Sequence, residues 1–337
     1  MQIIVFEAEV WEAEACSQLG AAHKLVCTPE PLSTANAASY ESAEAITTFV
    51  NSRLDATVLA ALPRLKLVAT RSTGYDHIDL DFCARAGIAV ANVPNYGDVT
   101  VAEHAFALLL GLTRNLLLTV EGMRSGRFDQ SEPPGIDLYG KTMGVIGTGR
   151  IGRRVISIAQ GFGMAVLASD AKPDQQLAAL EGFRYTDLEA LLRQADVISL
   201  HVPATADTQG MIGEAEFAMM KPEAILINTA RGNIVDVEAL VRALTGGQIR
   251  AAGLDVLPQE PLMRDEAEVF RGPPVDAASV KALLANHVLM QLPNVLMTPH
   301  VAYNTSEAQA RIIEGTIRNI EAFARGAPEN LVSPGRS

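Results

Sequence analysis

Short apolar runs rich in β-branched residues alternate with segments of helical periodicity along most of the chain. The runs are IIVF, AITTFV, LKLVAT and IAVANV before residue 100, and TMGVIG, MAVLASD, VISLHV, AILINTA, IRAAGLDV and NVLMTPH after residue 140. Strands that alternate with helices form βαβ units, so this order predicts an α/β fold with two doubly wound parallel sheets. A chain of 337 residues is long enough for two domains, each with its own core.

A long helical segment separates the two sets of runs. Thr100 and Glu103 have the spacing of a capping box, which predicts that this helix and the second domain begin at Thr100. The last helical segment, residues 306–325, is expected to return to the first domain. The predicted domains are therefore residues 1–99 with 302–337, and residues 100–301. Residues 262–292 interrupt the alternation of strands and helices, apart from a helical patch near 280–284. We interpret them as an excursion near a cleft between the two predicted domains.

Composition narrows the classes of partner. The chain has 27 basic and 39 acidic residues and a net charge of −12, which disfavours nucleic acids and anionic membranes. The apolar stretch 101–120 is interrupted by charged residues, so we expect a buried helix there and no membrane span. No export signal is evident in the first residues, which favours the cytoplasm. The three cysteines lack metal-type spacing, so neither a disulfide framework nor a metal site is expected.

The segment GTGRIG follows one predicted strand directly and opens a predicted helix. In a nucleotide-binding turn of this kind, Gly147 permits the turn, Gly149 lets the backbone approach a pyrophosphate, and Gly152 allows close helix packing. An ordinary glycine turn in an α/β sheet is the alternative. Asp170 ends the next run, where a carboxylate can bind the ribose hydroxyls and repel a 2′-phosphate. This favours NAD over NADP, although Lys172 weakens the preference slightly.

Three polar residues follow later runs and supply the chemistry of ketone reduction. His300 can act as general acid and base, and Glu260 can stabilise and orient its charged form. Arg231 can grip carboxylate and carbonyl oxygens with its planar guanidinium. Each residue alone also fits a structural role: a hydrogen-bonded histidine, a surface ion pair or a solvated loop. Their combination behind a dinucleotide loop favours catalysis.

Other polar positions allow two interpretations each. His104 lies on the apolar helix and is expected to be a satisfied core residue, whereas His201 is a candidate for lining the cofactor cleft. The turn RSTG after LKLVAT can cradle a substrate carboxylate with consecutive backbone N–H groups. It can equally be an ordinary strand-to-helix turn capped by Asp79.

Seven motifs occur in one order: RSTGYDHID, VAEHA, GVIGTGRIG, SLHVPAT, INTARG, GLDV with Glu260, and TPHVA. In these motifs the chain resembles the D-isomer-specific 2-hydroxyacid dehydrogenases along nearly its whole length. The resemblance implies a flavodoxin-like substrate domain and a Rossmann NAD domain, with the active site in the cleft between them. It also implies a homodimer, with the long helix near residue 100 forming much of the interface.

The resemblance assigns roles residue by residue. It implies that Arg231, Glu260 and His300 are the catalytic set, and that Ser72, Thr73, Gly74, Tyr96 and Tyr303 bind substrate. The cofactor residues that it implies are Val101, Gly147, Gly149, Arg150, Ile151, Gly152, Asp170, His201, Val202, Pro203, Thr229, Ala230 and Asp255.

Within the family, the long stretch from Glu260 to His300, the segment IDLYGKT and the ending NLVSP are similar to the D-lactate dehydrogenase branch. The expected reaction is therefore reduction of pyruvate, or a similar small 2-oxo acid, by NADH to the D-2-hydroxy acid. Gly97 and Asn51 depart from that branch and leave a larger or more polar acid open. Alternatives are a glyoxylate or hydroxypyruvate reductase, oxidation of formate or phosphite, and an NAD-sensing regulator similar to the C-terminal-binding corepressors.

Overall fold

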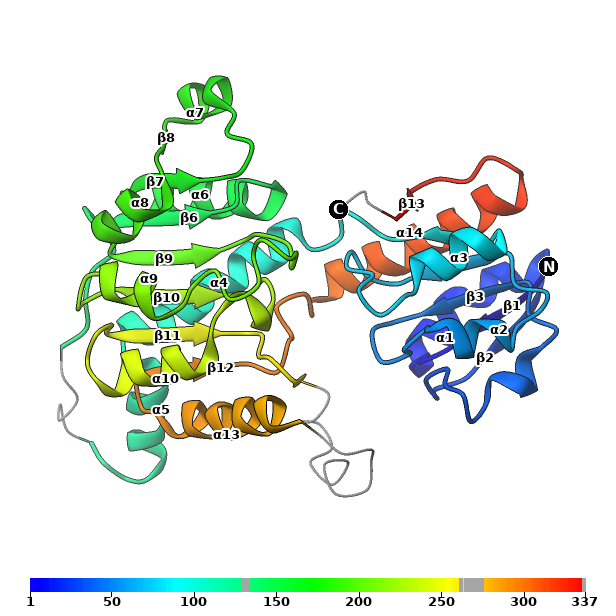
Figure 1. The fold of residues 1–337 in the computed structure, drawn as a ribbon, viewed down its shortest axis with the longest axis horizontal. Helices are drawn as coiled ribbons and strands as arrows, with labels where there is room; N and C mark the ends of the chain where they lie inside the picture. The colour runs from blue at the N-terminus through cyan, green and yellow to red at the C-terminus, as the bar shows by residue number, and fades with distance from the viewer. Residues whose placement is uncertain (129–133, 261–262, 264–275, 335–337) are drawn as a thin grey trace. The chain divides into compact units, whose positions relative to one another are not determined.

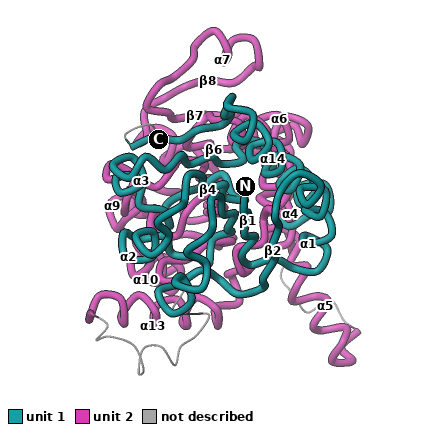
Figure 2. Tube along the Cα trace, turned by 90° about the vertical axis from the view of Figure 1, so that its right-hand side faces the viewer, with its two compact units in different colours: residues 1–96, 304–337 teal, residues 97–303 magenta. Residues whose placement is uncertain are grey.

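The computed structural model describes residues 1–128, 134–260, 263 and 276–334. The chain forms two compact units, residues 1–96 with 304–337 and residues 97–303 (Figures 1 and 2). The domain boundaries expected from the sequence, at residues 99 and 302, stay a prediction. Each unit is built on its own sheet.

The first unit contains a six-stranded sheet within the described residues, in the order β13-β5-β4-β3-β1-β2. Its strands pair in parallel, except that β13 runs antiparallel to β5. The order of β2, β1, β3, β4 and β5 is that of a flavodoxin-like doubly wound sheet. The elements are β1 (Gln2–Val5), α1 (Val10–Cys16), η1 (Ser17–Ala21), β2 (Lys24–Cys27), η2 (Ala37–Tyr40), β3 (Ala45–Thr48), α2 (Ala56–Ala60), β4 (Leu67–Thr70), α3 (Leu80–Ala86), β5 (Ala89–Ala91), α14 (Ser306–Ala324) and β13 (Leu331–Val332).

Successive side chains of each strand enter opposite faces of this sheet. In β1, Ile4 packs into a core with residues of α2 and α3, whereas Ile3 and Val5 pack into a second core with residues of α1 and α14. Both faces are therefore covered by helices. This burial on both sides explains why the strands read as continuous apolar runs.

The second unit contains a seven-stranded, fully parallel sheet in the order β12-β11-β10-β9-β6-β7-β8 (Figure 1). This is the Rossmann order, with the reversal of strand order between β6 and β9. The elements are α4 (Asp98–Thr113), α5 (Leu116–Arg124), β6 (Thr142–Ile146), α6 (Arg150–Gly161), β7 (Ala165–Ser169), α7 (Gln175–Glu181), β8 (Arg184–Tyr185), α8 (Leu188–Gln194), β9 (Val197–Leu200), α9 (Glu214–Met219), β10 (Ile225–Asn228), η3 (Gly232–Ile234), α10 (Val237–Thr245), β11 (Ala251–Leu254), α13 (Ala277–Gln291) and β12 (Val295–Met297).

The same alternation divides the core of the second unit. In β10, Leu226 packs with residues of α8, α9, α10 and α13, while Ile225 and Ile227 pack with residues of α4 and α6. The predicted fold class, two doubly wound sheets with helices on both faces, is confirmed.

Local details differ from the sequence-based expectations. The long helix begins at Asp98 with Gly97 as its N-cap, and Thr100 is buried inside the helix, so the predicted capping box at Thr100 is wrong. Gly97 precedes an acidic first turn, and Asp98 supplies the negative charge that a helix N-terminus favours. The helix ends at Thr113. Asn115, with a left-handed φ of 50°, interrupts the helical backbone before α5 begins. Of the excursion 262–292, α13 is described, whereas residues 261–262 and 264–275 lie outside the described residues.

Within the described chain, no single helix is long and apolar enough to cross a membrane. Only α4 and α5 taken together pass that test, and they are bent by 63° relative to each other. Most apolar residues of α4, among them Phe106 and Leu109, pack inside the core of the second unit.

Candidate active site

The glycine loop lies between β6 and α6, at the reversal of strand order. Gly147 has a φ of +94°, and a side chain there would approach the carbonyl oxygen of His201 to 2.6 Å. A side chain at Gly152 would come within 2.0 Å of the carbonyl oxygen of Gly147, so only glycine allows α6 to pack this closely. A Cβ atom added to Gly149, in contrast, would have no neighbouring atom within 4 Å, which leaves space in front of the helix N-terminus.

Asp170, which follows β7, binds the glycine loop through its carboxylate. Its Oδ2 accepts hydrogen bonds from the backbone N–H of Thr148 at 2.6 Å and from the Thr148 hydroxyl at 2.9 Å, and its Oδ1 accepts from the N–H of Lys172 at 2.8 Å. Burial raises the pKa of Asp170, but these bonds outweigh burial and hold the pKa below its ordinary value. The carboxylate is therefore ionised at neutral pH and ties the glycine loop to the end of β7.

These features fit a bound dinucleotide. The space at Gly149 and the N-terminus of α6 suit a pyrophosphate, because unpaired N–H groups and the helix dipole attract anions. Arg150 begins the helix and pairs with Asp98, with its Nε 3.0 Å from Oδ2. A carboxylate offers about four acceptor sites, so Asp170 retains capacity for ribose hydroxyls beside its loop bonds. Thr148, which links Asp170 to the Tyr185 hydroxyl at 2.7 Å, was not singled out from the sequence.

His201 follows β9 on the other side of the strand reversal. Its Nε2 lies 2.8 Å from the hydroxyl of Ser199, and burial of the imidazole lowers its pKa to about 4. His201 is therefore neutral at neutral pH and unsuited to proton transfer there. Val202 and Pro203 continue from it, and Thr229 and Ala230 follow β10 at the same edge of the sheet.

The structure brings Glu260 and His300 together although 39 residues separate them in the chain. The Nδ1 atom of His300 lies 2.8 Å from Oε2 of Glu260, and Oε1 of Glu260 accepts a bond from the N–H of Leu257 at 3.1 Å. A carboxylate only accepts, so Nδ1 carries the proton of this bond. His300 and Gln259 have φ values of 55° and 61°, so both turns of this pair contain a left-handed residue.

Asp255 anchors the turn that carries His300. Its side chain is buried, and Oδ1 accepts bonds from the Thr298 hydroxyl at 2.5 Å and the N–H of Val301 at 2.9 Å, while Oδ2 accepts from the N–H of Ala302 at 2.9 Å. The Thr298 hydroxyl donates its only proton to Asp255, so Nε2 of His104, 2.9 Å away, donates to Thr298. His104 is thus hydrogen-bonded as expected, but it is half-buried rather than part of the core.

The electrostatics of Asp255 follow from these contacts. Burial raises its pKa, but His104, whose Nε2 lies 3.5 Å from Oδ1, and hydrogen bonds from Thr298 and two backbone N–H groups outweigh burial, and the pKa lies below its ordinary value. Through these bonds the carboxylate holds both the His300 turn and the side chain of His104. Sequence reasoning assigned Asp255 to the cofactor and did not foresee this anchoring.

Arg231 directly follows Ala230 at the end of β10, and its Nη1 donates to the Ala230 carbonyl at 2.8 Å. Asn228 fixes this turn, since its Nδ2 donates to the Arg231 carbonyl at 2.9 Å and its Oδ1 accepts from the Ala230 N–H at 3.0 Å. A Cβ on Gly232 would meet the backbone of Leu257 at 2.0 Å. The turn of Arg231 therefore packs directly against the segment that leads to Glu260.

In the first unit, the hydroxyl side chains of the turn after β4 donate to backbone carbonyl groups of the same unit. The Ser72 hydroxyl donates to the Gly74 carbonyl at 2.5 Å, and the Thr73 hydroxyl donates to the Val93 carbonyl at 2.9 Å. Among the described residues, the backbone N–H groups of Ser72, Thr73 and Gly74 donate no hydrogen bond, so they can serve an anion. Asp79 caps α3 by accepting a hydrogen bond from the Phe82 N–H. A helix-capping turn and an anion-binding turn are therefore compatible here.

The remaining predicted residues are placed as follows. The carbonyl oxygen of Tyr96 accepts a bond from Nε of Arg311 at 2.8 Å in the first unit, and Tyr303 is a half-buried residue at the end of the second unit. Val101 and Ile151 lie in the first turns of α4 and α6.

Comparison with known proteins supplies the family. Residues 106–302 match the family model described as "D-isomer specific 2-hydroxyacid dehydrogenase, NAD binding domain". This chain belongs to the D-isomer-specific 2-hydroxyacid dehydrogenase family. It is an NAD-dependent oxidoreductase, and the expectation from its seven motifs is confirmed.

Similar members of this dehydrogenase family carry different substrate names. The chain is 38% identical over 298 residues to a glyoxylate reductase of Thermococcus litoralis, covering 86% of this chain and 83% of the relative. It is 39% identical over 283 residues to a glycerate dehydrogenase of Methylorubrum extorquens, covering 82% of each. The structure of a D-lactate dehydrogenase from Aquifex aeolicus, complexed with NAD and lactic acid, superposes with a TM-score of 0.88 and 37% identity, covering 99% of this chain and 100% of that one.

Proposed function

We propose that this dehydrogenase reduces a small 2-oxo acid to the D-2-hydroxy acid, with His300 as the proton donor and, in the reverse direction, the acceptor. The observation that carries the proposal is the 2.8 Å bond between Nδ1 of His300 and Glu260. This bond leaves Nε2 of the ring for the substrate. NADH supplies the hydride when it is bound, so the protein must supply the proton.

Each candidate group has one task in this proposal. Protonated His300 donates its Nε2 proton to the carbonyl oxygen of the substrate, and Glu260 holds the ring in orientation and stabilises its positive charge. Arg231 binds the substrate carboxylate and polarises the carbonyl, because its guanidinium offers several donors in one plane. The backbone N–H groups of residues 72–74 stay a predicted anion-binding turn of the first unit.

Among substrates, we propose pyruvate first, with glyoxylate and hydroxypyruvate as the alternatives. Pyruvate is supported by the similarity to the D-lactate dehydrogenase structure over the whole chain. The relatives named glyoxylate reductase and glycerate dehydrogenase support the alternatives at 38% and 39% identity.

A substrate panel tests this proposal. The purified protein is incubated with NADH and either pyruvate, glyoxylate or hydroxypyruvate, and chiral chromatography identifies the product of each reaction. We expect D-lactate from pyruvate, and a reduction of kcat by about 10²-fold or more in His300→Ala because proton transfer is lost. NADH binding without turnover of any 2-oxo acid would favour an NAD-sensing regulator. Turnover of formate or phosphite alone would exclude a 2-oxo acid reductase.

We further propose that the protein is a homodimer, formed in large part by α4 and α5. Leu116, Leu117 and Met123 on α5 are 57%, 48% and 51% exposed, an apolar face that a second copy can cover. Sedimentation equilibrium is expected to give a dimer, and Leu117→Lys is expected to weaken it. Leu180→Lys, at a residue of α7 that is 85% exposed, is the matched control and is expected to leave the mass unchanged. A monomeric wild type at micromolar concentration would refute the dimer.

A further inference from the structure

The backbone segment Leu257–Pro258 lies just before Glu260 in the chain and connects the candidate catalytic groups. The N–H of Leu257 donates to Oε1 of Glu260 at 3.1 Å, and the other oxygen of that carboxylate bonds His300. On its other side, the backbone of Gly232, next to Arg231, packs within contact distance of the same segment. A displacement of this segment would therefore move Glu260, and His300 with it.

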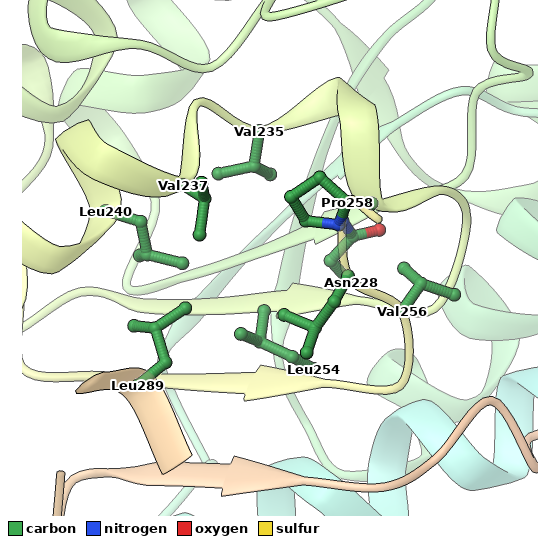
Figure 3. A pocket seen from close by; sticks show the side chains of 10 residues that line it. Asn228, Val235, Val237, Leu240, Leu254, Val256, Pro258 and Leu289 are labelled. Atoms are coloured by element: carbon green, nitrogen blue, oxygen red, sulfur yellow. The ribbon is translucent and has the colours of Figure 1, made fainter. Parts of the chain in front are cut away.

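A small pocket lies beside the backbone of Leu257 and Pro258. Leu257 and Pro258 line this pocket together with Asn228, Val256 and Leu289, and Figure 3 shows Pro258 and Asn228 on one side of it and Leu289 on the other. On the side of this pocket the segment has fewer van der Waals neighbours. A directional contact adds to the packing of this segment.

Asn286 of α13 supplies that contact. Its side chain is completely buried, and Nδ2 donates to the carbonyl oxygen of Pro258 at 2.7 Å and contacts Sδ of Met263 at 3.2 Å. Its Oδ1 is buried and has no hydrogen-bond partner among the described residues. A buried amide with an unpaired oxygen contributes less to stability than an apolar residue of the same volume, because the apolar residue has no oxygen to leave unpaired. Its Nδ2 bond gives this position a use other than stability.

We propose that Asn286 is a positioning residue, which holds the Leu257–Pro258 segment and through it the Glu260–His300 pair. This inference rests on the proposed function of that pair. Asn286 does not touch the reacting atoms, so its loss should act on the proton-transfer step and leave cofactor binding intact. In this way α13 becomes part of the catalytic apparatus.

The first test compares Asn286→Leu with Asn294→Leu. Asn294 makes the same kind of bond, from its Nδ2 to the Arg250 carbonyl at 2.9 Å. Asn294 precedes β12 and Arg250 precedes β11, so this bond lies at the ends of the strands opposite to the candidate site. We expect Asn286→Leu to lower kcat at least tenfold, with an unchanged KM for NADH and a larger solvent deuterium isotope effect. Asn294→Leu should change none of these. Equal effects of the two substitutions would assign Asn286 a general structural role.

A double-mutant cycle gives the second test. If Asn286 acts through Glu260, adding Asn286→Leu to Glu260→Gln should lower kcat less than twofold further. Multiplicative effects of the two substitutions would overturn the proposal. Asn286→Ser, whose hydroxyl is too short to reach the Pro258 carbonyl, serves as a second variant if the leucine variant does not fold.

A readout that needs no turnover separates this inference from the proposed function. In protein labelled with ¹⁵N-histidine, the ring nitrogens of His300 are assigned with His300→Ala. We expect Asn286→Leu to move the Nδ1 resonance toward its position in Glu260→Gln, whereas Asn294→Leu leaves it in place. An unmoved resonance in both Asn286 variants would refute the positioning role, whether or not any 2-oxo acid is a substrate.

Discussion

Replacing Asp255 by asparagine tests how the turn of His300 is held. The carboxylate accepts from the Thr298 hydroxyl and the Val301 N–H through Oδ1, and from the Ala302 N–H through Oδ2. An amide has one acceptor oxygen, so in either orientation its NH₂ group opposes at least one of these donors. Because Asp255 is only 1% exposed, water cannot replace the lost bond.

The magnitude follows from these contacts. Losing one hydrogen bond to a charged group costs about 1.5–3 kcal/mol, and the bonds that remain lose their ionic character, so we expect a loss of about 2–4 kcal/mol in the free energy of unfolding. For a cooperative unit of about 200 residues this corresponds to a decrease in Tm of roughly 5–15 °C. Scanning calorimetry measures it directly. Asp187→Asn is the matched control, because asparagine caps a helix about as well as the Asp187 that caps α8.

The pH dependence gives an independent check with a definite sign. The pKa of Asp255 is lower in the folded protein than its ordinary value, so its contribution to stability is present above the unfolded pKa and lost as pH falls through the folded pKa. The gap in stability between wild type and Asp255→Asn should therefore narrow as pH falls below about 4. A variant within about 0.5 kcal/mol of wild type at pH 7 would refute the anchoring role, since surface substitutions commonly stay in that range.

Four further substitutions test the cofactor loop and the substrate clamp. Gly152→Ala forces a Cβ to 2.0 Å from the Gly147 carbonyl, so we expect about 1–3 kcal/mol of destabilisation in denaturant titrations, whereas Gly149→Ala should leave stability unchanged and weaken NADH binding measured by fluorescence. Asp170→Ala removes a negative charge, and we expect the ratio of the KM values for NADPH and NADH to fall about tenfold, equivalent to about 1.4 kcal/mol; an unchanged ratio would exclude Asp170 as the discriminating group. Arg231→Lys loses the planar set of donors, and steady-state kinetics should show kcat/KM for the 2-oxo acid lower by about 10–100-fold; a normal value would contradict the clamp.

Sequence patterns determined the fold class and the family of this protein. Apolar runs such as those of β6 and β10 record burial on both faces of a sheet, because every side chain of a central parallel strand enters a core. The glycine loop was equally readable, since Gly147 and Gly152 meet steric demands that arise within one strand, turn and helix. Short edge strands such as β2 and β13 were missed, because β2 is only partly buried and β13 has two residues.

Tertiary structure alone decided which side chains are partners. The sequence named Glu260 and His300, but their 2.8 Å bond depends on two turns that the sheet brings together. No pattern indicated that Asp255 anchors the His300 turn, or that Asn286, on a helix predicted only as a patch, holds the Pro258 carbonyl. Periodicity reports the burial of a residue relative to its neighbours in the chain. Hydrogen-bond partners distant in sequence depend on packing in three dimensions, which a local pattern does not encode.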